Sequence, residues 1–196
     1  PFTVKSETAD FNFANDNKVF VPYVNDNRGG ERYCYSFESY YDESKMSEMY
    51  ADSIAITPLM VCLDGGKKAV LMEAGVENYP GMFLKKNPAA AHGLTAEFAP
   101  VPKTEVIGGH ARLNLVPAER HGYIATLSAG QALPWRVVLV ADNDAQLLNN
   151  DMAQRLAPVC RIADVSWIRP GKVAWDWWNT CNLTGVDFKA GMNTAT

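Results

Sequence analysis

The sequence predicts a mainly β fold: a β-sandwich with one short helix, followed near residue 165 by the start of a β/α domain. Three observations lead to this prediction. Most of the first 140 residues alternate between apolar and polar side chains, and turn residues separate the runs. Only one stretch has helical spacing. Beyond residue 165 the composition changes to a linker and a dense aromatic run.

Length and composition exclude several classes of protein. The chain has 196 residues, of which 47% are hydrophobic and 20% are charged, enough for one domain with a sizeable core. A net charge of −4 argues against binding to nucleic acid, which needs a basic face. No run approaches 18 apolar residues, so we expect no membrane span. The sequence opens on Pro1 without a visible signal peptide, and we expect a processed chain or a piece of a longer one.

The four cysteines do not form a metal site. Cys34, Cys62, Cys160 and Cys181 include no C-x-x-C pair and have no histidine at zinc-finger spacing. We expect buried or half-buried free thiols. One disulfide is the alternative if the protein is exported.

The first strands come from two alternating segments. In "DFNFANDNKVFVPY", residues 10–23, an Asn/Asp turn separates two aromatic runs. In "ERYCYSFESYY", residues 31–41, the side chains of Tyr33, Tyr35 and Phe37 share one face of a predicted strand. Both segments therefore predict strands of a sheet with one apolar face.

The clearest hairpin lies in "ITPLMVCLDGGKKAVLMEAGV", residues 56–76. Two apolar runs flank Asp64-Gly65-Gly66, where glycine supplies the positive φ of a tight turn. Residues 111–130 predict a second pair of strands around Pro117 to Gly122. The continuous apolar run "PWRVVLVAD", residues 134–142, is typical of a strand that is buried on both faces.

Two segments between and after these strands have a different character. Residues 79–110 are rich in Pro, Gly and Ala, which predicts loops with one or two short strands. Residues 142–158 predict the helix: Asp142 or Asn143 can cap it and Pro158 ends it. Its apolar side chains recur at helical spacing, at Leu147, Leu148, Met152 and Leu156.

The aromatic run near the end of the sequence predicts the first strand of a second domain. Pro170-Gly171 marks a linker, and Val173 to Trp178 is too apolar for the edge of a sandwich. Asn193 or Thr194 would cap a following helix. A strand, a loop and a helix cap are the opening of a β/α domain. We therefore predict a sandwich domain over 1–165 and a linker with a truncated barrel over 166–196.

Acidic residues are the better candidates for chemistry. His92, His110 and His121 have no metal-binding spacing and are expected in turns. Glu73 follows an apolar run and precedes a Gly- and Pro-containing loop, so it is either a solvated strand end or a carboxylate that reaches a partner. Asp176 lies among aromatic residues and needs a hydrogen bond, an ion pair or a metal.

Several motifs together resemble glycoside hydrolase family 97, the bacterial α-glucosidases and α-galactosidases. They are "SWIRPGKVAWDWWN", "GVDFKAGMNT", the hairpin with "EAGVENYPGM", "FAPVP" and "PWRVVLVADNDAQLLNND". The resemblance covers nearly the whole chain. It implies an N-terminal super-β-sandwich, a (β/α)8 barrel and a small C-terminal β domain. This chain then resembles the latter part of the sandwich, incomplete at its start, plus the first barrel strand.

The resemblance also implies a function. The parent protein is expected to be a calcium-dependent glycoside hydrolase that acts on α-glucosides or α-galactosides, and both inverting and retaining members are known. The catalytic acid and the base or nucleophile are expected on later barrel strands, so no catalytic residue lies in this chain and the chain alone is expected to be inactive. Glu73 is expected to bind calcium. Trp178, Asn179 and Asp176 are expected near the oligosaccharide substrate.

The resemblance implies a periplasmic or otherwise exported protein whose partner is the remainder of its own barrel. A non-catalytic carbohydrate-binding β-sandwich is the alternative. It predicts that the aromatic side chains of residues 31–41 form an exposed face for sugar rings. A purely structural sandwich domain is a third interpretation.

Overall fold

The computed structural model describes residues 1–22, 32–33, 41–108 and 114–172. The chain forms two compact units, Pro1–Pro158 and Val159–Thr196, each of which is described by itself. The predicted domain boundary between residues 165 and 166 stays a prediction. In the described part of the chain, no helix is long and apolar enough to cross a membrane.

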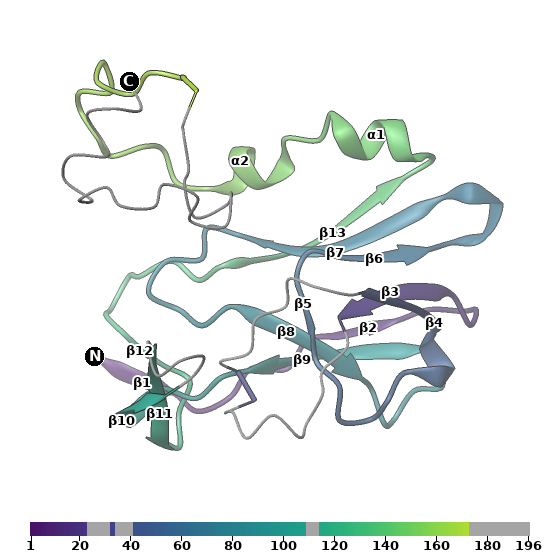
Figure 1. The fold of residues 1–196 in the computed structure, drawn as a ribbon, viewed down its shortest axis with the longest axis horizontal. Helices are drawn as coiled ribbons and strands as arrows, with labels where there is room; N and C mark the ends of the chain where they lie inside the picture. Colours follow the sequence, from purple (N-terminus) through teal and green to yellow (C-terminus); the bar gives the residue numbers. More distant parts are fainter. Residues whose placement is uncertain (23–31, 34–40, 109–113, 173–196) are drawn as a thin grey trace, which may run out of the picture. The chain divides into compact units, whose positions relative to one another are not determined.

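Two antiparallel sheets form the body of the first unit (Figure 1). The five-stranded sheet has the order β13-β7-β6-β3-β4 and the four-stranded sheet the order β2-β9-β8-β5. The strands of the first sheet are β3 (Lys18–Pro22), β4 (Tyr41–Lys45), β6 (Leu59–Cys62), β7 (Lys68–Ala74) and β13 (Trp135–Ala141). Those of the second are β2 (Asp10–Asn12), β5 (Ala55–Ile56), β8 (Met82–Lys86) and β9 (Gly93–Phe98). The predicted mainly β fold is confirmed, and the two sheets agree with a β-sandwich.

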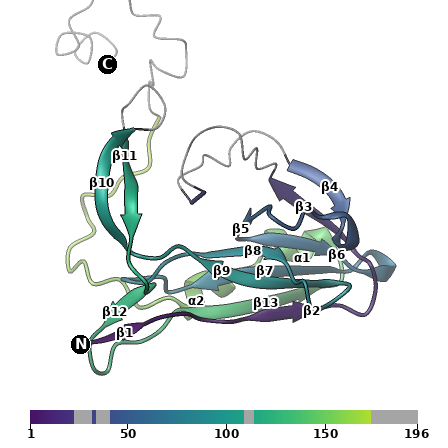
Figure 2. The same ribbon diagram turned by 90° about the horizontal axis from the view of Figure 1, so that it is seen from below.

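Two smaller strand pairs complete the first unit. β1 (Phe2–Val4) pairs with β12 (Ala125–Leu127), and β10 (Pro102–Gly108) pairs with β11 (Asn114–Arg120). Figure 2 shows the β10–β11 pair extending away from the two main sheets. Short 3-10 turns lie at Met46–Glu48 and Asp64–Gly66.

The predicted hairpin around residue 65 is confirmed. β6 and β7 pair in antiparallel register, with Leu59 opposite Leu71 and Cys62 opposite Lys68. Gly65 and Gly66 have φ values of 70° and 82°, the left-handed region that glycine enters at little cost. The turn chemistry of the sequence therefore sets the register of this pair.

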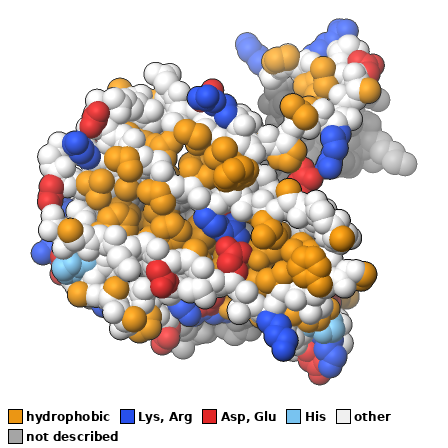
Figure 3. Space-filling view, turned by 180° about the vertical axis from the view of Figure 1, so that it is seen from behind, with side chains coloured by type: hydrophobic (Ala, Val, Ile, Leu, Met, Phe, Trp, Pro, Cys, Tyr) orange, Lys and Arg blue, Asp and Glu red, His pale blue; other side chains and the backbone are white. Residues whose placement is uncertain are grey.

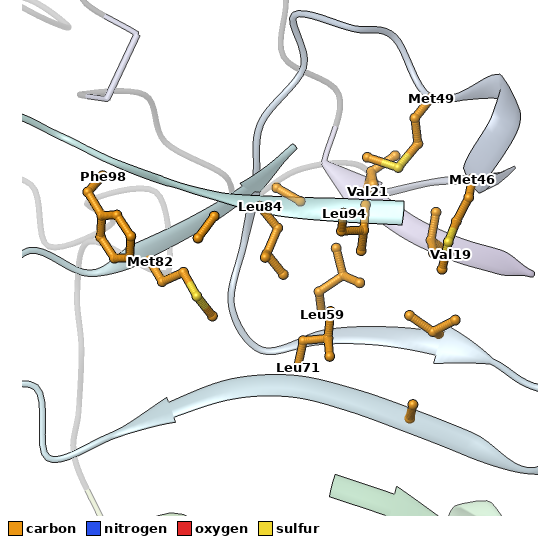
Figure 4. Packing of buried hydrophobic residues seen from close by; sticks show 14 of the residues in the cluster. Val19, Val21, Met46, Met49, Leu59, Leu71, Met82, Leu84, Leu94 and Phe98 are labelled. Atoms are coloured by element: carbon orange, nitrogen blue, oxygen red, sulfur yellow. The ribbon is translucent and has the colours of Figure 1, made fainter. Parts of the chain in front are cut away.

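The hydrophobic core lies between the two main sheets (Figure 4). Val61 and Leu71 enter it from the five-stranded sheet, and Leu84 and Leu94 enter from the four-stranded sheet; all four are fully buried. Burial alternates from residue to residue along β6 and over the first three residues of β8, as expected for strands with one face on a core.

The predicted single helix is two short helices. α1 (Asp144–Leu148) begins after Asn143, whose side chain accepts a hydrogen bond from the Gln146 N–H at 3.2 Å. α2 (Met152–Leu156) follows and ends before Pro158. Between them, the side chain of Asn150 accepts a hydrogen bond from the Met152 N–H at 2.9 Å. Asparagine side chains compete with the helix for backbone donors in this way, which explains the break.

Two strand predictions are wrong in detail. Residues 79–110 contain β8, β9 and β10, more than the one or two short strands expected. Pro117 lies inside β11, opposite Glu105, so the turn comes after residue 120. β11 and β12 do not pair with each other, because each finds a partner elsewhere in the sequence. Proline is tolerated in β11 because, among the described residues, this strand pairs only with β10 and its other edge is unpaired.

β13 differs from the predicted doubly buried strand. Among the described residues it pairs only with β7, at one end of the sheet order. Leu139 and Ala141 are buried, whereas Val138 and Val140 are 52% and 64% exposed. The apolar run forms the expected strand, but one of its faces is open in the first unit.

The remaining predictions concern the end of the sequence and the cysteines. Residues 159–172 contain no helix or strand and have exposed side chains. Cys62 is a half-buried free thiol, as predicted, but Cys160 is exposed because it lies in this segment. Cys34 and Cys181 lie outside the described residues, as do Tyr35, Phe37 and the predicted barrel strand.

Leu71→Ala tests the core. We expect a loss of about 2–5 kcal/mol in the free energy of unfolding, because a fully buried side chain is removed and a cavity remains. The measurement is urea denaturation of the chain. Leu148→Ala is the control: Leu148 is 87% exposed, and its loss should change the free energy by at most about 0.5 kcal/mol. Equal midpoints for the two variants would contradict this description of the core.

Candidate functional site

Glu73 lies near the end of β7, as the sequence predicts, but its side chain faces inward. It is paired in register with Arg136 of β13, as Leu71 is with Val138. Paired residues of an antiparallel ladder share a face. Glu73 therefore lies on the same face as the fully buried Leu71, and its side chain is only 8% exposed.

Both carboxylate oxygens of Glu73 have partners. Oε2 accepts hydrogen bonds from the Met82 N–H at 2.8 Å and from the Thr57 hydroxyl at 3.2 Å. Oε1 forms an ion pair with the guanidinium of Arg136. Glu73 is therefore a buried and paired carboxylate, and the alternative of a solvated strand end is wrong. Its role as a calcium ligand stays a prediction.

Arg136 is the centre of this cluster. Its guanidinium binds Glu7 with two hydrogen bonds, Nε to Oε1 at 2.6 Å and Nη2 to Oε2 at 2.9 Å. The guanidinium also lies over the rings of Phe98, at 4.8 Å, and Tyr79, at 5.7 Å. The carboxylates balance the positive charge of the guanidinium, and the two rings pack against its planar faces.

This geometry explains the spacing of the "EAGVENYPGM" segment. Its first and last residues, Glu73 and Met82, are joined by a hydrogen bond from the backbone N–H to the carboxylate, which closes the loop between β7 and β8. The Tyr79 hydroxyl donates to Oε2 of Glu7 at 2.8 Å. Gly75 and Asn78 turn the backbone with φ values of 65° and 53°. The segment therefore encloses the Arg136 cluster.

The pKa values of the cluster follow from its contacts. Burial by itself would raise the pKa of Glu7, but hydrogen bonds from Arg136 and Tyr79, with the charge of Arg136, hold the pKa below its ordinary value. Burial, together with the hydrogen bond to Glu7, raises the pKa of Tyr79 to about 12. Glu7 is therefore ionised and Tyr79 is neutral at pH 7, which matches the donor and acceptor roles of their hydrogen bond.

The described residues do not build a calcium site by themselves. Among them, no three His, Cys, Asp or Glu side chains gather closely enough to hold a metal ion. Calcium in proteins takes six to eight oxygen ligands. A carboxylate such as that of Glu73 is a ligand type that calcium accepts, but the cation that Glu73 meets in this structure is Arg136.

A second charged cluster surrounds Glu97 of β9. Its carboxylate pairs with Arg32 at 2.8 Å and Lys85 at 2.7 Å, and it accepts a hydrogen bond from the Tyr33 hydroxyl at 2.8 Å. Glu97 is opposite Phe83 in the ladder, and the Phe83 ring lies 5.5 Å from that of Tyr33. The side chains of residues 32 and 33 are thus anchored on the outer face of the four-stranded sheet.

This second cluster bears on the alternative of a carbohydrate-binding module. Burial raises the pKa of Tyr33 to about 12, helped by the hydrogen bond to Glu97. Tyr33 packs on Phe83 and lies beneath the Arg120 guanidinium, 5.1 Å from the ring centroid. Its ring is therefore covered by protein groups and is not a free platform for a sugar ring.

The other candidate residues are placed as follows. His92 and His121 lie in turns or loops, as predicted, and His121 stacks on Tyr123 with ring centroids 4.7 Å apart. His110 lies outside the described residues, and so do Asp176, Trp178 and Asn179. Their expected contacts with substrate stay predictions.

Sequence reasoning missed Arg136, Glu7 and Glu97. One signal was present for Arg136, since a lone arginine within the apolar run "PWRVVLVAD" requires a buried counter-charge. No local pattern indicates Glu7, which is 129 residues away in the sequence.

Comparison with known proteins agrees with this fold and motif set. A family model described as "Glycosyl-hydrolase 97 N-terminal" matches residues 1–158. The chain belongs to the glycosyl-hydrolase 97 family. It is 38% identical to a retaining alpha-galactosidase of Bacteroides thetaiotaomicron over an alignment of 199 positions that covers 100% of this chain. It is also 40% identical over 52 residues, 26% of the chain, to a probable retaining alpha-galactosidase of Streptomyces bingchenggensis.

The matched relatives are much longer than this chain. The match spans 30% of the Bacteroides protein and 8% of the Streptomyces protein. The family model ends at Pro158, where the first compact unit also ends. The whole-chain match continues through the aromatic run beyond it.

Glu97→Gln tests the second cluster through its pH dependence. Burial would raise the pKa of Glu97, but hydrogen bonds from Lys85, Tyr33 and Arg32 outweigh it and lower the pKa below the ordinary 4.5. A lowered folded-state pKa stabilises the fold above the unfolded-state pKa, and this contribution is lost as the pH falls through the folded-state value.

The measurement is the thermal midpoint of wild type and variant from pH 7 down to pH 3. We expect the variant to be less stable at pH 7 and the difference to shrink below a pH of about 4.5. If the thermal midpoints of the two proteins fall in parallel with pH, the charge of Glu97 does not contribute to the stability of the fold.

Proposed function

We propose that the whole protein is a glycoside hydrolase that cleaves α-galactosides with retention of configuration. The observation that carries this proposal is the 38% identity to a retaining alpha-galactosidase over the full length of this chain. In this proposal residues 1–165 are part of the sandwich domain, and residues 166–196 begin the catalytic barrel.

The chemistry requires two carboxylates, and the charged cluster in the described part of the chain does not suit that task. A retaining glycosidase places a nucleophile and a general acid roughly 5–5.5 Å apart beside the sugar. Glu7 and Glu73 share the buried Arg136, and the lowered pKa of Glu7 is the opposite of what a general acid needs. We therefore place both catalytic carboxylates outside residues 1–196, and expect this chain alone to be inactive.

We further propose that the enzyme depends on calcium and that Glu73 is one of its ligands. The proposal rests on the "EAGVENYPGM" motif and the family resemblance. Bound calcium would supply a fixed positive charge beside the sugar. The remaining ligands would come from outside the described residues, and we route no catalytic step through the ion.

The substrate contacts and the cellular location complete the proposal. Trp178, Asn179 and Asp176 follow the linker and would lie at the end of the first barrel strand, where active sites of such barrels are found. The enzyme is proposed to be exported to the periplasm, where oligosaccharides would reach it. Both statements rest on the family resemblance.

Assay of the full-length protein tests the reaction. We expect hydrolysis of an aryl α-galactoside, with the α-anomer of galactose as the first product detected by proton NMR. An aryl α-glucoside is the matched comparison, and residues 1–196 alone are the inactive control. Preference for the glucoside would reject the proposed substrate, and the β-anomer as first product would reject retention.

Glu73→Gln in the full-length enzyme tests the calcium proposal. Glu7→Gln is a matched control, because it removes the other carboxylate partner of Arg136 and leaves Glu73 in place. Each variant is expected to lose about 1–3 kcal/mol of stability without calcium, since a buried charge loses one partner.

Only Glu73→Gln should shift the calcium concentration that gives half-maximal activity, and it should also weaken calcium binding measured by calorimetry. If the calcium titrations of Glu73→Gln and wild type superimpose, Glu73 is not a ligand and serves only as the counter-ion of Arg136.

A further inference from the structure

The Asp64-Gly65 pair in the turn between β6 and β7 is chemically distinct from the rest of the sequence. It is the single Asp-Gly pair among the 196 residues, and no Asn-Gly pair is present. In such a pair the backbone nitrogen of the glycine can attack the side-chain carboxyl of the residue before it, because glycine has no side chain to obstruct the approach. The turn chemistry that sets the register of the hairpin therefore also places a reactive pair at its tip.

The structure leaves the reacting groups accessible. Asp64, Gly65 and Gly66 are all exposed. The Gly65 N–H lies in the first turn of the short 3-10 turn Asp64–Gly66, where N–H groups have no partner within the turn. Among the described residues, apart from the chain neighbours, no heavy atom lies within 4 Å of the position that a Cβ would take on Gly65 or Gly66. The turn can therefore change its backbone conformation without displacing packed groups.

A hydrogen bond from Asn15 restrains the Asp64 side chain. The side-chain amide of Asn15, in the segment before β3, donates to Oδ2 of Asp64. The attack requires the carboxyl carbon of Asp64 to turn toward the Gly65 nitrogen, a rotation that this hydrogen bond opposes. Asn15 therefore slows a reaction that the open turn permits.

We propose that Asp64 isomerises spontaneously to isoaspartate and that Asn15 restrains this modification. The Gly65 nitrogen bonds to the side-chain carboxyl carbon of Asp64. The nitrogen gives up its proton and the protonated carboxyl its hydroxyl, so that a water molecule departs and a five-membered succinimide ring forms. A solvent water then opens the ring: cleavage of the original peptide bond leaves isoaspartate, and cleavage of the new bond restores aspartate. The inference does not depend on the proposed glycosidase activity.

The modification changes the geometry of the hairpin. In isoaspartate the backbone runs through the side-chain carboxyl, so the turn becomes longer by one carbon atom. The turn is closed by a hydrogen bond from the Leu63 N–H to the Lys67 carbonyl at 2.9 Å, directly beside the paired residues Cys62 and Lys68. β6 and β7 are both inner strands of the five-stranded sheet. We therefore expect isoaspartate to loosen the pairing at this end of the hairpin and to lower the thermal midpoint.

Ageing of the full-length protein tests the proposal. The protein is kept at body temperature and neutral pH for several weeks and is then digested, and electron-transfer fragmentation in the mass spectrometer distinguishes isoaspartate from aspartate. Asp52 is the internal comparison: it is also exposed in a turn, but it precedes Ser53, whose N–H donates to the Tyr50 carbonyl at 3.2 Å. We expect isoaspartate to accumulate several-fold faster at Asp64 than at Asp52. Equal rates at the two positions, or no isoaspartate at Asp64, would overturn the proposal.

Asn15→Ala tests the restraint. It should raise the rate at Asp64 by roughly three- to tenfold, which is the rate equivalent of one intramolecular hydrogen bond, and leave the rate at Asp52 unchanged. An unchanged rate at Asp64, or an equal increase at both positions, would show that Asn15 does not restrain the reaction and would overturn that part of the proposal.

Asp64→Glu separates this reaction from other effects of ageing, because its longer side chain does not form the five-membered ring. We expect the thermal midpoint to fall on ageing in wild type and to stay constant in Asp64→Glu. Hydrophobic side chains gather in broad areas of the molecular surface (Figure 3), so the midpoints are measured at low protein concentration to limit association. Equal falls in the two proteins would show that isoaspartate at Asp64 does not loosen the hairpin.

Discussion

The ion cluster around Arg136 is the constraint on which the architecture of the first unit depends. A guanidinium turned toward the core must have its charge matched, because an unpaired buried charge costs several kcal/mol. Glu73 matches it from the adjacent strand, and Glu7 matches it from the segment before β2. The aromatic rings that cover its faces come from β9 and from the loop before β8. One side chain thereby fixes the relative positions of elements from both sheets.

The core face of β13 is covered at Arg136 but exposed further along the strand. At Arg136 the core face of β13 is covered by Glu7, Tyr79 and Phe98. Two residues further along, Val138 on that face is more than half exposed. Among the described residues, the polar end of β13 is covered by these three side chains, whereas Val138 and Val140 at its apolar end are more than half exposed.

The sequence predicted the features that depend on local chemistry. Asp64-Gly65-Gly66 requires a tight turn, and the hairpin and the position of Glu73 at the end of β7 follow from it. It did not predict features that depend on distant partners. The cluster of Arg136 joins residues up to 129 positions apart, and neither partner carries a local signal of the other. Pro117 indicated a turn by its own preference, but its position in a two-stranded pair tolerates it within β11.

The charge of the cluster connects the fold to the proposed chemistry. Glu7 and Glu73 together carry two negative charges, and Arg136 carries one positive charge, so one negative charge remains at the buried end of β7. The hydrogen bond from Tyr79 stabilises this charge without neutralising it. Part of this negative charge lies on Glu7, whose side chain is 26% exposed, so water also stabilises it. In the calcium proposal, the same negative charge would favour the approach of the ion once the remaining ligands are present.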